Sequence, residues 1–211
     1  SITLFACALW QQTQLPERAK WQEVLQQDPK QTPTHRQPFN TTVNGVQYTI
    51  KPLYDYQLSG MVVSLHRADT WWDYLHQEWN DHLNISDVCV IFGNNAKNNA
   101  YQDFSFSSGQ FTCNFKTRSN EAYALFDQTA LSNNHLLSDK PDLIEEIRKV
   151  RVGDQIYFRG VLAEYAHQHD GRAFKRGSST VRTDTGNGAC ETIYIDEFVI
   201  LKAGGAPWHT L

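Results

Sequence analysis

A cysteine and a histidine that stand far apart in the sequence are the residues best suited to nucleophilic chemistry. Cys190 lies in the segment TDTGNGACE and His135 in the segment LSNNHLL. A cysteine sulfur attacks effectively when an imidazole beside it exchanges its proton and a third group orients that ring, a role open here to Asn133 or Asn134. The alternative is structural, with Cys190 as a small apolar residue at a strand start and His135 packed in a turn. We expect the structural role, because no complete catalytic set is visible in the sequence.

Histidine and aspartate residues are concentrated in two segments, and a metal site is therefore a second kind of chemistry that the sequence suggests. His167 and His169 form an HxH pair beside Asp170, and a strand would place both rings on one face. Earlier in the chain, histidines alternate with aspartates; these residues are His66, Asp69, Asp73, His76, Asp81 and His82. Solvated His and Asp side chains are common where a strand runs out into a loop, so we expect no metal ion and no other cofactor.

The connection between the last two expected strands, residues 166–189, is the best candidate for ligand binding. It has four basic side chains against two acidic ones, with a phenylalanine among the cations. The candidate contact residues are Arg172, Phe174, Lys175, Arg176 and Arg182. Such cations bind phosphate groups, and such rings stack on bases, in proteins that bind single-stranded nucleic acid. The net charge of -4 disfavours nucleic acid as the partner, and a solvated loop is the alternative.

The loop TDTGNGA within that connection has both an anion-binding and a structural interpretation. Its Gly and Asn residues could turn backbone N–H groups toward an anion, but the spacing of a phosphate-binding loop is absent. We therefore expect Thr183, Asp184 and Thr185 to order the loop through local hydrogen bonds. Arg182 is expected to pair with the carboxylate of Asp184 or Glu191.

Aromatic side chains are concentrated between positions 71 and 79. Trp72, Leu75 and Trp79 recur at helical spacing, which indicates a short helix with these rings in the core. The alternative is an exposed surface for contact with a protein or a sugar, formed by Trp71, Trp72, Tyr74 and Trp79. The helical spacing favours the core.

The four cysteines show no CxxC spacing, which disfavours a zinc ribbon and thioredoxin-like chemistry. Cys89 and Cys113 lie on strands that we expect to be sequential and antiparallel, and they are therefore a disulfide candidate. Two buried thiols are the alternative. An oxidising compartment such as the periplasm would permit the bond, with Cys190 unpaired in either case.

The elements that must position these residues are mainly strands, recognised as runs of β-branched and aromatic residues between turn signals. The expected strands are 56–65, 87–92, 111–117, 155–166 and 192–201. The segment Pro141–Val150 is the clearest helix, because Leu143, Ile144 and Ile147 recur on one face and proline fits its first turn.

This order of elements predicts a mainly β fold, an OB-like five-stranded barrel with one helix between the third and fourth strands, preceded by an irregular N-terminal arm. Gly160 in the fourth strand suits strong curvature. A β-sandwich is the alternative. The expected division is an arm at 1–45, the OB-like domain at 46–203 and a tail at 204–211.

The opening run SITLFACALW is apolar and resembles the end of a signal or anchor segment, or else an edge strand. Cys7 lies there in a context loosely like a lipoprotein cleavage site. The chain has no run of the roughly 18 apolar residues that a membrane span needs. Its 211 residues, of which 40% are hydrophobic, favour one folded domain.

Several stretches resemble those of an uncharacterised family of proteobacterial proteins that usually have an N-terminal membrane anchor. They are YTIKPLYDYQLSGMVVS, SNNHLL, VGDQIYFRGVL and TDTGNGACE, in order between about residues 47 and 200. The resemblance implies a compact domain in the cell envelope, attached to the membrane through a segment before residue 1. It implies no substrate.

These observations predict a non-enzymatic binding or assembly module of the bacterial cell envelope that faces the periplasm, with another envelope protein as its partner. A cytoplasmic location is the alternative. Two other functions stay open. One is an oligonucleotide or anionic-ligand binder that uses residues 166–189, and the other is a hydrolase or transferase that uses Cys190 and His135.

Overall fold

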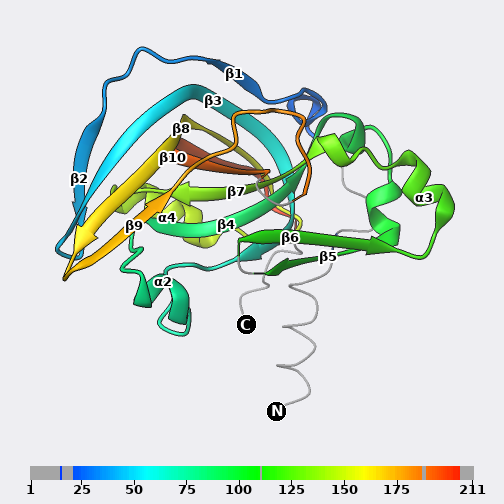
Figure 1. Ribbon diagram of the computed structural model, residues 1–211. Helices are drawn as coiled ribbons and strands as arrows, with labels where there is room; N and C mark the ends of the chain where they lie inside the picture. The colour runs from blue at the N-terminus through cyan, green and yellow to red at the C-terminus, as the bar shows by residue number, and fades with distance from the viewer. Residues whose placement is uncertain (1–14, 16–20, 110, 187–188, 205–211) are drawn as a thin grey trace, which may run out of the picture.

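The computed structural model describes residue 15 and residues 21–109, 111–186 and 189–204, which form a mainly β structure (Figure 1). The apolar run with Cys7 and nearly all of the tail lie outside these ranges. The strands are β1 (Lys30–Pro33), β2 (Phe39–Val43), β3 (Val46–His66), β4 (Asn84–Ile91), β5 (Phe104–Gly109), β6 (Thr112–Thr117), β7 (Leu131–Leu137), β8 (Gln155–His169), β9 (Arg172–Arg176) and β10 (Cys190–Lys202). The α-helices are α2 (Tyr74–Glu78), α3 (Asn120–Leu125) and α4 (Pro141–Lys149). No helix within the described ranges is long and apolar enough to cross a membrane.

One large mixed sheet is built around the long strand β3. Strand β3 pairs with β4, β4 with β7, β7 with β10, and β10 with β8, while β8 also pairs with β3. The β7–β10 pair is parallel and the other pairs are antiparallel. Strands β1 and β2 add to β3, so the segment expected as an irregular arm joins the sheet from Lys30 onward. Strand β9 pairs with the last residues of β8, from Tyr165 to His169.

The third strand of the sheet differs from the expectation. The segment expected at 111–117 forms β6, which pairs with β5 in a separate two-stranded sheet. Its place beside β4 is taken by β7, the LSNNHLL segment. Asparagine has low strand propensity, so this segment does not look like a strand in the sequence. Its pairing with β4 on one side and β10 on the other overrides that local preference.

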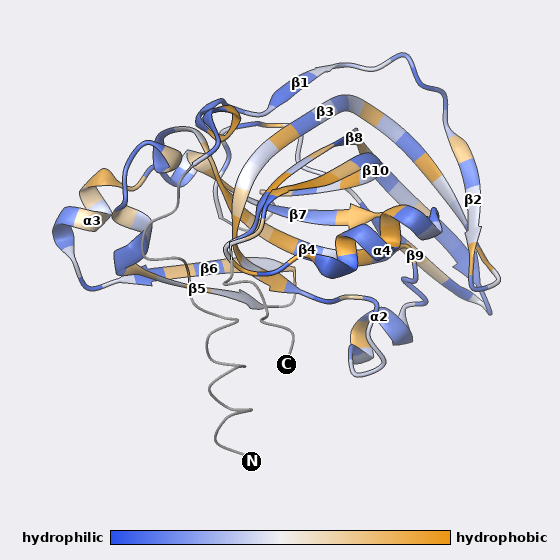
Figure 2. Ribbon diagram, turned by 180° about the vertical axis from the view of Figure 1, so that it is seen from behind, coloured by the Kyte–Doolittle hydropathy of each residue, from blue (hydrophilic) through white to orange (hydrophobic). Residues whose placement is uncertain are grey.

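Helix α4 packs across the sheet as its sequence predicts (Figure 2). Pro141 begins it, and Ile147 and Val150 are buried in the main core with strand residues that include Val88 and Leu136. Leu143 and Ile144 pack against the same core and are partly buried, so the apolar stripe faces the strands. The helix follows β7 and precedes β8 in the chain. Its buried stripe shows that it covers one face of the sheet.

The aromatic segment 71–79, which includes α2, is at the surface, so the expectation that the rings of Trp72 and Trp79 fill the core is wrong. Trp71 is 84% exposed and Trp72 is 64% exposed, and Tyr74 is exposed as well. The helix α2 has only one turn, and the residue that it buries is His76. A helical period over so short a segment does not decide which face is covered.

A disulfide joins Cys89 of β4 to Cys113 of β6, with their Cα atoms 5.9 Å apart. Because β6 belongs to the two-stranded sheet, the bond links the β5–β6 hairpin to the main sheet. It does not join two neighbouring strands of one sheet, as the sequence had suggested. Cys190 is free.

Strands β8 and β10 lie so close at Gly160 that any side chain there would clash. A Cβ atom on Gly160 would be 2.1 Å from the carbonyl oxygen of Tyr194. We expect Gly160→Ala to lower the free energy of unfolding by about 2 kcal/mol or more, because backbone atoms must shift to relieve the overlap. Urea unfolding followed by circular dichroism measures it. Gly177→Ala is the matched control, since no atom lies within 4 Å of a Cβ there. Equal midpoints for the two variants would contradict the close approach.

Candidate active site

The sheet brings together three reactive side chains that are far apart in the sequence. In the β4–β7 pair Asp87 is directly opposite His135, and in the β7–β10 pair Thr192 is opposite His135, which places Cys190 two residues along on the same face. Val88 and Leu136 are in the main core. Since side chains alternate along a strand, Asp87 and His135 face away from that core and toward the β5–β6 hairpin.

A short contact joins the two buried members of this set. His135 Nδ1 lies 2.6 Å from Asp87 Oδ1, and their side chains are only 4% and 1% exposed. The same carboxylate oxygen accepts a hydrogen bond of 2.8 Å from the Asn84 amide. A buried ion pair with a third hydrogen-bonding group is better satisfied than an isolated pair, because desolvation otherwise opposes it.

The pKa values of both partners indicate an ion pair at neutral pH. Burial alone raises the pKa of Asp87, but the charge and hydrogen bond of His135 outweigh it and bring the pKa to about 2. Burial lowers the pKa of His135, but the charge and hydrogen bond of Asp87, with a smaller contribution from a Cys190 hydrogen bond, raise it to about 9. Asp87 therefore fixes both the orientation and the charge of the imidazole.

The Cys190 thiol has partners on two further segments. Its S–H donates to the carbonyl oxygen of Phe111 at 3.2 Å, and Asn133 Nδ2 donates to its sulfur at 3.5 Å. The residue is half-buried and lines a cleft of about 400 Å³. The polar residues that line this cleft include Thr112, Asn114, Gln128, Asn133, Asp184 and Thr185. A molecule in this cleft would reach the sulfur.

The orienting residue differs from the two that the sequence suggested. Asn133 contacts the sulfur and not the ring, and the Asn134 amide donates to the Val88 and Ser132 carbonyl groups. Asp87 takes the orienting role. The signal that could have identified it is a carboxylate inside the otherwise apolar run DVCVIF, because ionised residues are seldom fully buried without a partner.

A second cleft, of about 710 Å³, shares Phe111 with the first and contains most of the predicted ligand-binding residues. Arg172, Phe174, Lys175 and Arg176 line it together with Glu78, Trp79, Phe111 and Ala173. The Arg176 guanidinium carbon is 4.1 Å from the centre of the Phe111 ring and 5.6 Å from that of Phe174. Trp79 stacks on Phe111 with ring centres 5.7 Å apart. The cleft thus combines exposed aromatic surface with cations.

The cations of this cleft are partly engaged by the protein itself. Arg172 donates to the Glu78 carbonyl at 2.8 Å, Lys175 lies 2.9 Å from Glu164, and Arg176 lies 3.4 Å from Asp81. A bound anion would compete with these contacts, so the positive charge available to it is smaller than the sequence suggests.

Arg182 lies apart from the other candidates. It donates to the Thr129 carbonyl at 3.0 Å, and its guanidinium carbon is 4.7 Å from the Phe92 ring centre. The predicted partners bind elsewhere: Asp184 accepts from Ser179, and Glu191 accepts from Ser132 at 2.6 Å. The loop is ordered by local hydrogen bonds at Asp184, while positions 187 and 188 lie outside the described residues.

Phe111 links the two clefts, since it lines both of them. Its φ angle of 60° lies in the left-handed region, which costs a residue with a Cβ atom about 1–2 kcal/mol. Contacts with Trp79, Arg176 and Cys190 surround it. Strain of this kind persists where surrounding contacts determine the conformation, and it is frequent at functional sites.

Among the residues that the structure describes, the HxH pair is not part of a group of three possible metal ligands. His167 is buried, its Nε2 lies 2.8 Å from the Trp79 carbonyl, and its ring stacks on Phe174. His169 lies 3.4 Å from Asp170 at the surface. Within the described ranges, the group of three or more His, Cys, Asp or Glu ligand atoms close enough to hold an ion is His66, Asp73 and His76.

No family model, curated protein or solved structure matches this chain.

The pH dependence of stability tests the Asp87–His135 pair. The contribution of a histidine whose pKa rises from 6.5 to about 9 is complete below pH 6.5 and is lost as the pH rises through 9. We expect the urea midpoint to fall over this window. Asp87→Asn should remove the fall and lower the His135 pKa, which NMR titration of the ring protons measures.

Glu191→Gln is the control for this experiment. Burial raises the Glu191 pKa from 4.5 to about 7. The folded protein therefore also loses stability as this carboxyl group ionises, but in the lower pH window from 4.5 to 7. The control should abolish the loss of stability in that lower window and keep the one above pH 7. A His135 ring that titrates near 6.5 in the wild-type protein would contradict the ion pair.

Proposed function

We propose that this chain is a cysteine-dependent hydrolase or transferase, with Cys190 as the nucleophile and His135 as its acid–base partner. The observation that supports it is the position of the His135 ring, which contacts the buried Asp87 carboxylate through Nδ1 on the same face of the sheet as Cys190. Nucleophile, base and orienting group in this order are the arrangement that thiol catalysis requires. Asp87 is a positioning residue, because it acts through His135.

The chemistry follows from these positions. The Cys190 sulfur attacks as the thiolate, the reactive form, at a carbonyl carbon, and a C–S bond forms. His135 gives its proton to the leaving group as the bond to that group breaks. Water or a second acceptor then attacks the thioester, the C–S bond breaks, and the proton of the attacking group passes to His135. The Asn133 amide, next to the sulfur, supplies a donor for the developing oxyanion.

The strand order supports a binding surface at this place. We propose that β3, β4, β7, β8 and β10 form an OB-like barrel, since the pairings run from β3 through β4, β7, β10 and β8 back to β3, with α4 between the third and fourth strands. In OB folds the face of strands two and three and the connections 1–2 and 4–5 bind the ligand. The larger cleft is lined by residues of the connections that correspond to 1–2 and 4–5, and the smaller cleft by residues of β7 and of the connection that corresponds to 4–5.

We also propose the location that the sequence suggested, a domain of the cell envelope that faces the periplasm. The Cys89–Cys113 disulfide supports it, because such bonds persist in oxidising compartments and are rare in the cytosol. The molecule on which Cys190 acts would then be a component of the envelope, either small or part of another protein.

The reactivity of Cys190 tests the proposed enzyme. We expect chloroacetamide to alkylate Cys190 near pH 7, and p-nitrophenyl acetate to give a burst of nitrophenol that Cys190→Ser abolishes. His135→Gln should slow both reactions at least 10-fold, since acid–base groups contribute about 10²–10⁴-fold. Mass spectrometry of the peptide with Cys190 measures the first reaction.

The controls separate catalysis from misfolding. His169→Gln makes the same change on a partly exposed ring outside the site and should leave both rates unaltered. Near-UV circular dichroism verifies the fold of each variant, and Asp87→Asn gives a second variant if His135→Gln does not fold. Thiol catalysis would be excluded if the wild-type protein were alkylated as slowly as the Asp87→Asn variant and gave no burst of nitrophenol.

A second candidate function is non-enzymatic binding of an anionic ligand with flat rings in the larger cleft. The observation that favours it is the Arg176 guanidinium between the Phe111 and Phe174 rings, with Trp79 alongside. Cations and stacking surfaces together are the features that bind single-stranded nucleic acid.

A fluorescent oligothymidylate tests this second candidate. We expect binding that weakens as salt increases and that falls at least 10-fold in a Lys175→Gln, Arg176→Gln double variant. Arg159→Gln is the control, because Arg159 pairs with Glu197 on other strands. Binding that is independent of salt, or equal in all three proteins, would contradict it. The Cys190→Ser variant should bind as the wild type does, which distinguishes this function from the first.

A further inference from the structure

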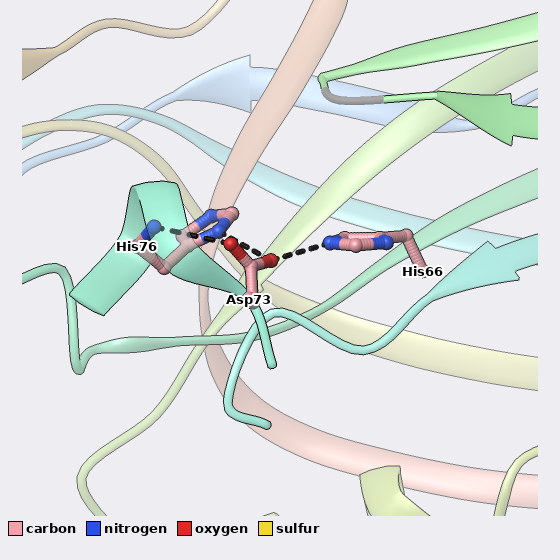
Figure 3. Close-up of side chains that lie close together, drawn as sticks. All are labelled: His66, Asp73 and His76. Atoms are coloured by element: carbon pink, nitrogen blue, oxygen red, sulfur yellow. Dashed lines mark hydrogen bonds and ion pairs between the residues drawn. The ribbon is translucent and has the colours of Figure 1, made fainter. Parts of the chain in front are cut away.

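Two histidines and one aspartate converge at the place where β3 gives way to α2. Asp73 Oδ2 lies 2.5 Å from His66 Nε2 and 2.8 Å from His76 Nδ1, so the carboxylate is between the two rings (Figure 3). All three ligand atoms lie within 4.8 Å of one another. The second carboxylate oxygen of Asp73 accepts the backbone N–H of His76 at 3.1 Å and caps α2.

The three side chains come from two elements, β3 and α2. His66 is the last residue of β3, and Ser86 holds it by donating to its carbonyl oxygen at 2.9 Å. Asp73 and His76 are three residues apart across the single turn of α2 and so lie on the same side of it. The side chains of Asp73 and His76 are 1% exposed, whereas that of His66 is 26% exposed. The cluster is thus preformed and accessible from the His66 side.

The donor set suits a first-row transition metal ion. Imidazole nitrogen and carboxylate oxygen are the ligands of zinc sites with three protein ligands and an open position, and of other divalent ions of this series. Metal–ligand bonds of about 2.0–2.1 Å at tetrahedral angles separate ligand atoms by about 3.3 Å, so the present contacts need to lengthen by less than about 1 Å. His66 is the last residue of β3 and the most exposed of the three ligands, so it is the one best placed to make that shift.

Groups beyond the three ligands complete the arrangement. The other nitrogen of His76, Nε2, lies 3.7 Å from Asp81 and 3.2 Å from the Asn84 amide nitrogen. A ligating histidine usually has its second nitrogen directed at a carboxylate, which fixes the tautomer and strengthens the ligand.

We propose that His66, Asp73 and His76 bind one divalent first-row transition ion, with the remaining coordination position open toward solvent beside His66. The ion fastens α2 to the end of β3. That contact orders the connection from which Trp79 enters the larger cleft. The site is independent of the proposed thiol chemistry, since it shares no residue with Asp87, His135 and Cys190.

Metal titration of the tag-free chain tests the site. After treatment with a chelator, we expect one Zn²⁺ per chain in competition with a chromophoric indicator, and Co²⁺ should give the visible absorption of a low-coordinate site. His66→Gln should weaken Zn²⁺ binding at least 10-fold. It removes the most accessible ligand and leaves the buried Asp73–His76 pair in place, so the variant should fold. Zn²⁺ should also raise the melting temperature of the wild type and not that of His66→Gln.

Two further variants make the outcome decisive. His35→Gln removes an exposed histidine outside the cluster and should bind Zn²⁺ as the wild type does. Cys190→Ser should also bind normally, so that a failure of the thiol chemistry and a failure of the metal site are distinguishable. No Zn²⁺ binding by the wild type, or binding that His66→Gln leaves unchanged and that is therefore adventitious, overturns the proposal.

Discussion

The contact between the Asp87 carboxylate and the His135 imidazole is the interaction on which the proposed site depends. It joins β4 to β7 on the face of the sheet opposite the main core, where both groups are removed from water. Removing one partner of a buried ion pair leaves an uncompensated charge, which costs about 3–5 kcal/mol. The pair is therefore a feature whose loss the fold tolerates poorly, and it places a charged ring on the same face of the sheet as Cys190.

A chain of polar contacts extends from this pair along the same face of the sheet. The Asn84 amide donates to Asp87 and lies near His76, which contacts Asp73, which in turn contacts His66. Hydrogen bonds shared among buried polar side chains favour one arrangement of those side chains. The proposed metal site and the proposed thiol site are thus neighbours in one network, although neither needs the other for its chemistry.

Strong local patterns in the sequence predicted the elements they belong to, and weak ones did not. The helix at Pro141 has proline, a stripe and a long enough period, and β8 and β10 are rich in β-branched and aromatic residues, so these were recognised. Strand β7 was missed because its asparagines disfavour a strand until neighbours on both sides pair with it. The pairing of Cys190 with His135 was raised from residue types alone. The segment with His66, Asp73 and His76 was noticed for its histidines and aspartates, and Asp87 could have been noticed in its apolar run. Which of these side chains meet depends on strand register and on one helical turn, which no local pattern encodes.

The disulfide between Cys89 and Cys113 has a topological consequence. It closes the segment from Cys89 to Cys113, which includes β5 and Phe111, into a covalent ring that links β4 to β6. A protease that cut the backbone anywhere inside this ring would produce two fragments that remain one molecule until a reductant is added. The segment whose carbonyl group contacts the Cys190 thiol would stay linked to the sheet after such a cut. The contact between the Phe111 carbonyl and the Cys190 thiol is thus maintained by the disulfide as well as by the continuous backbone.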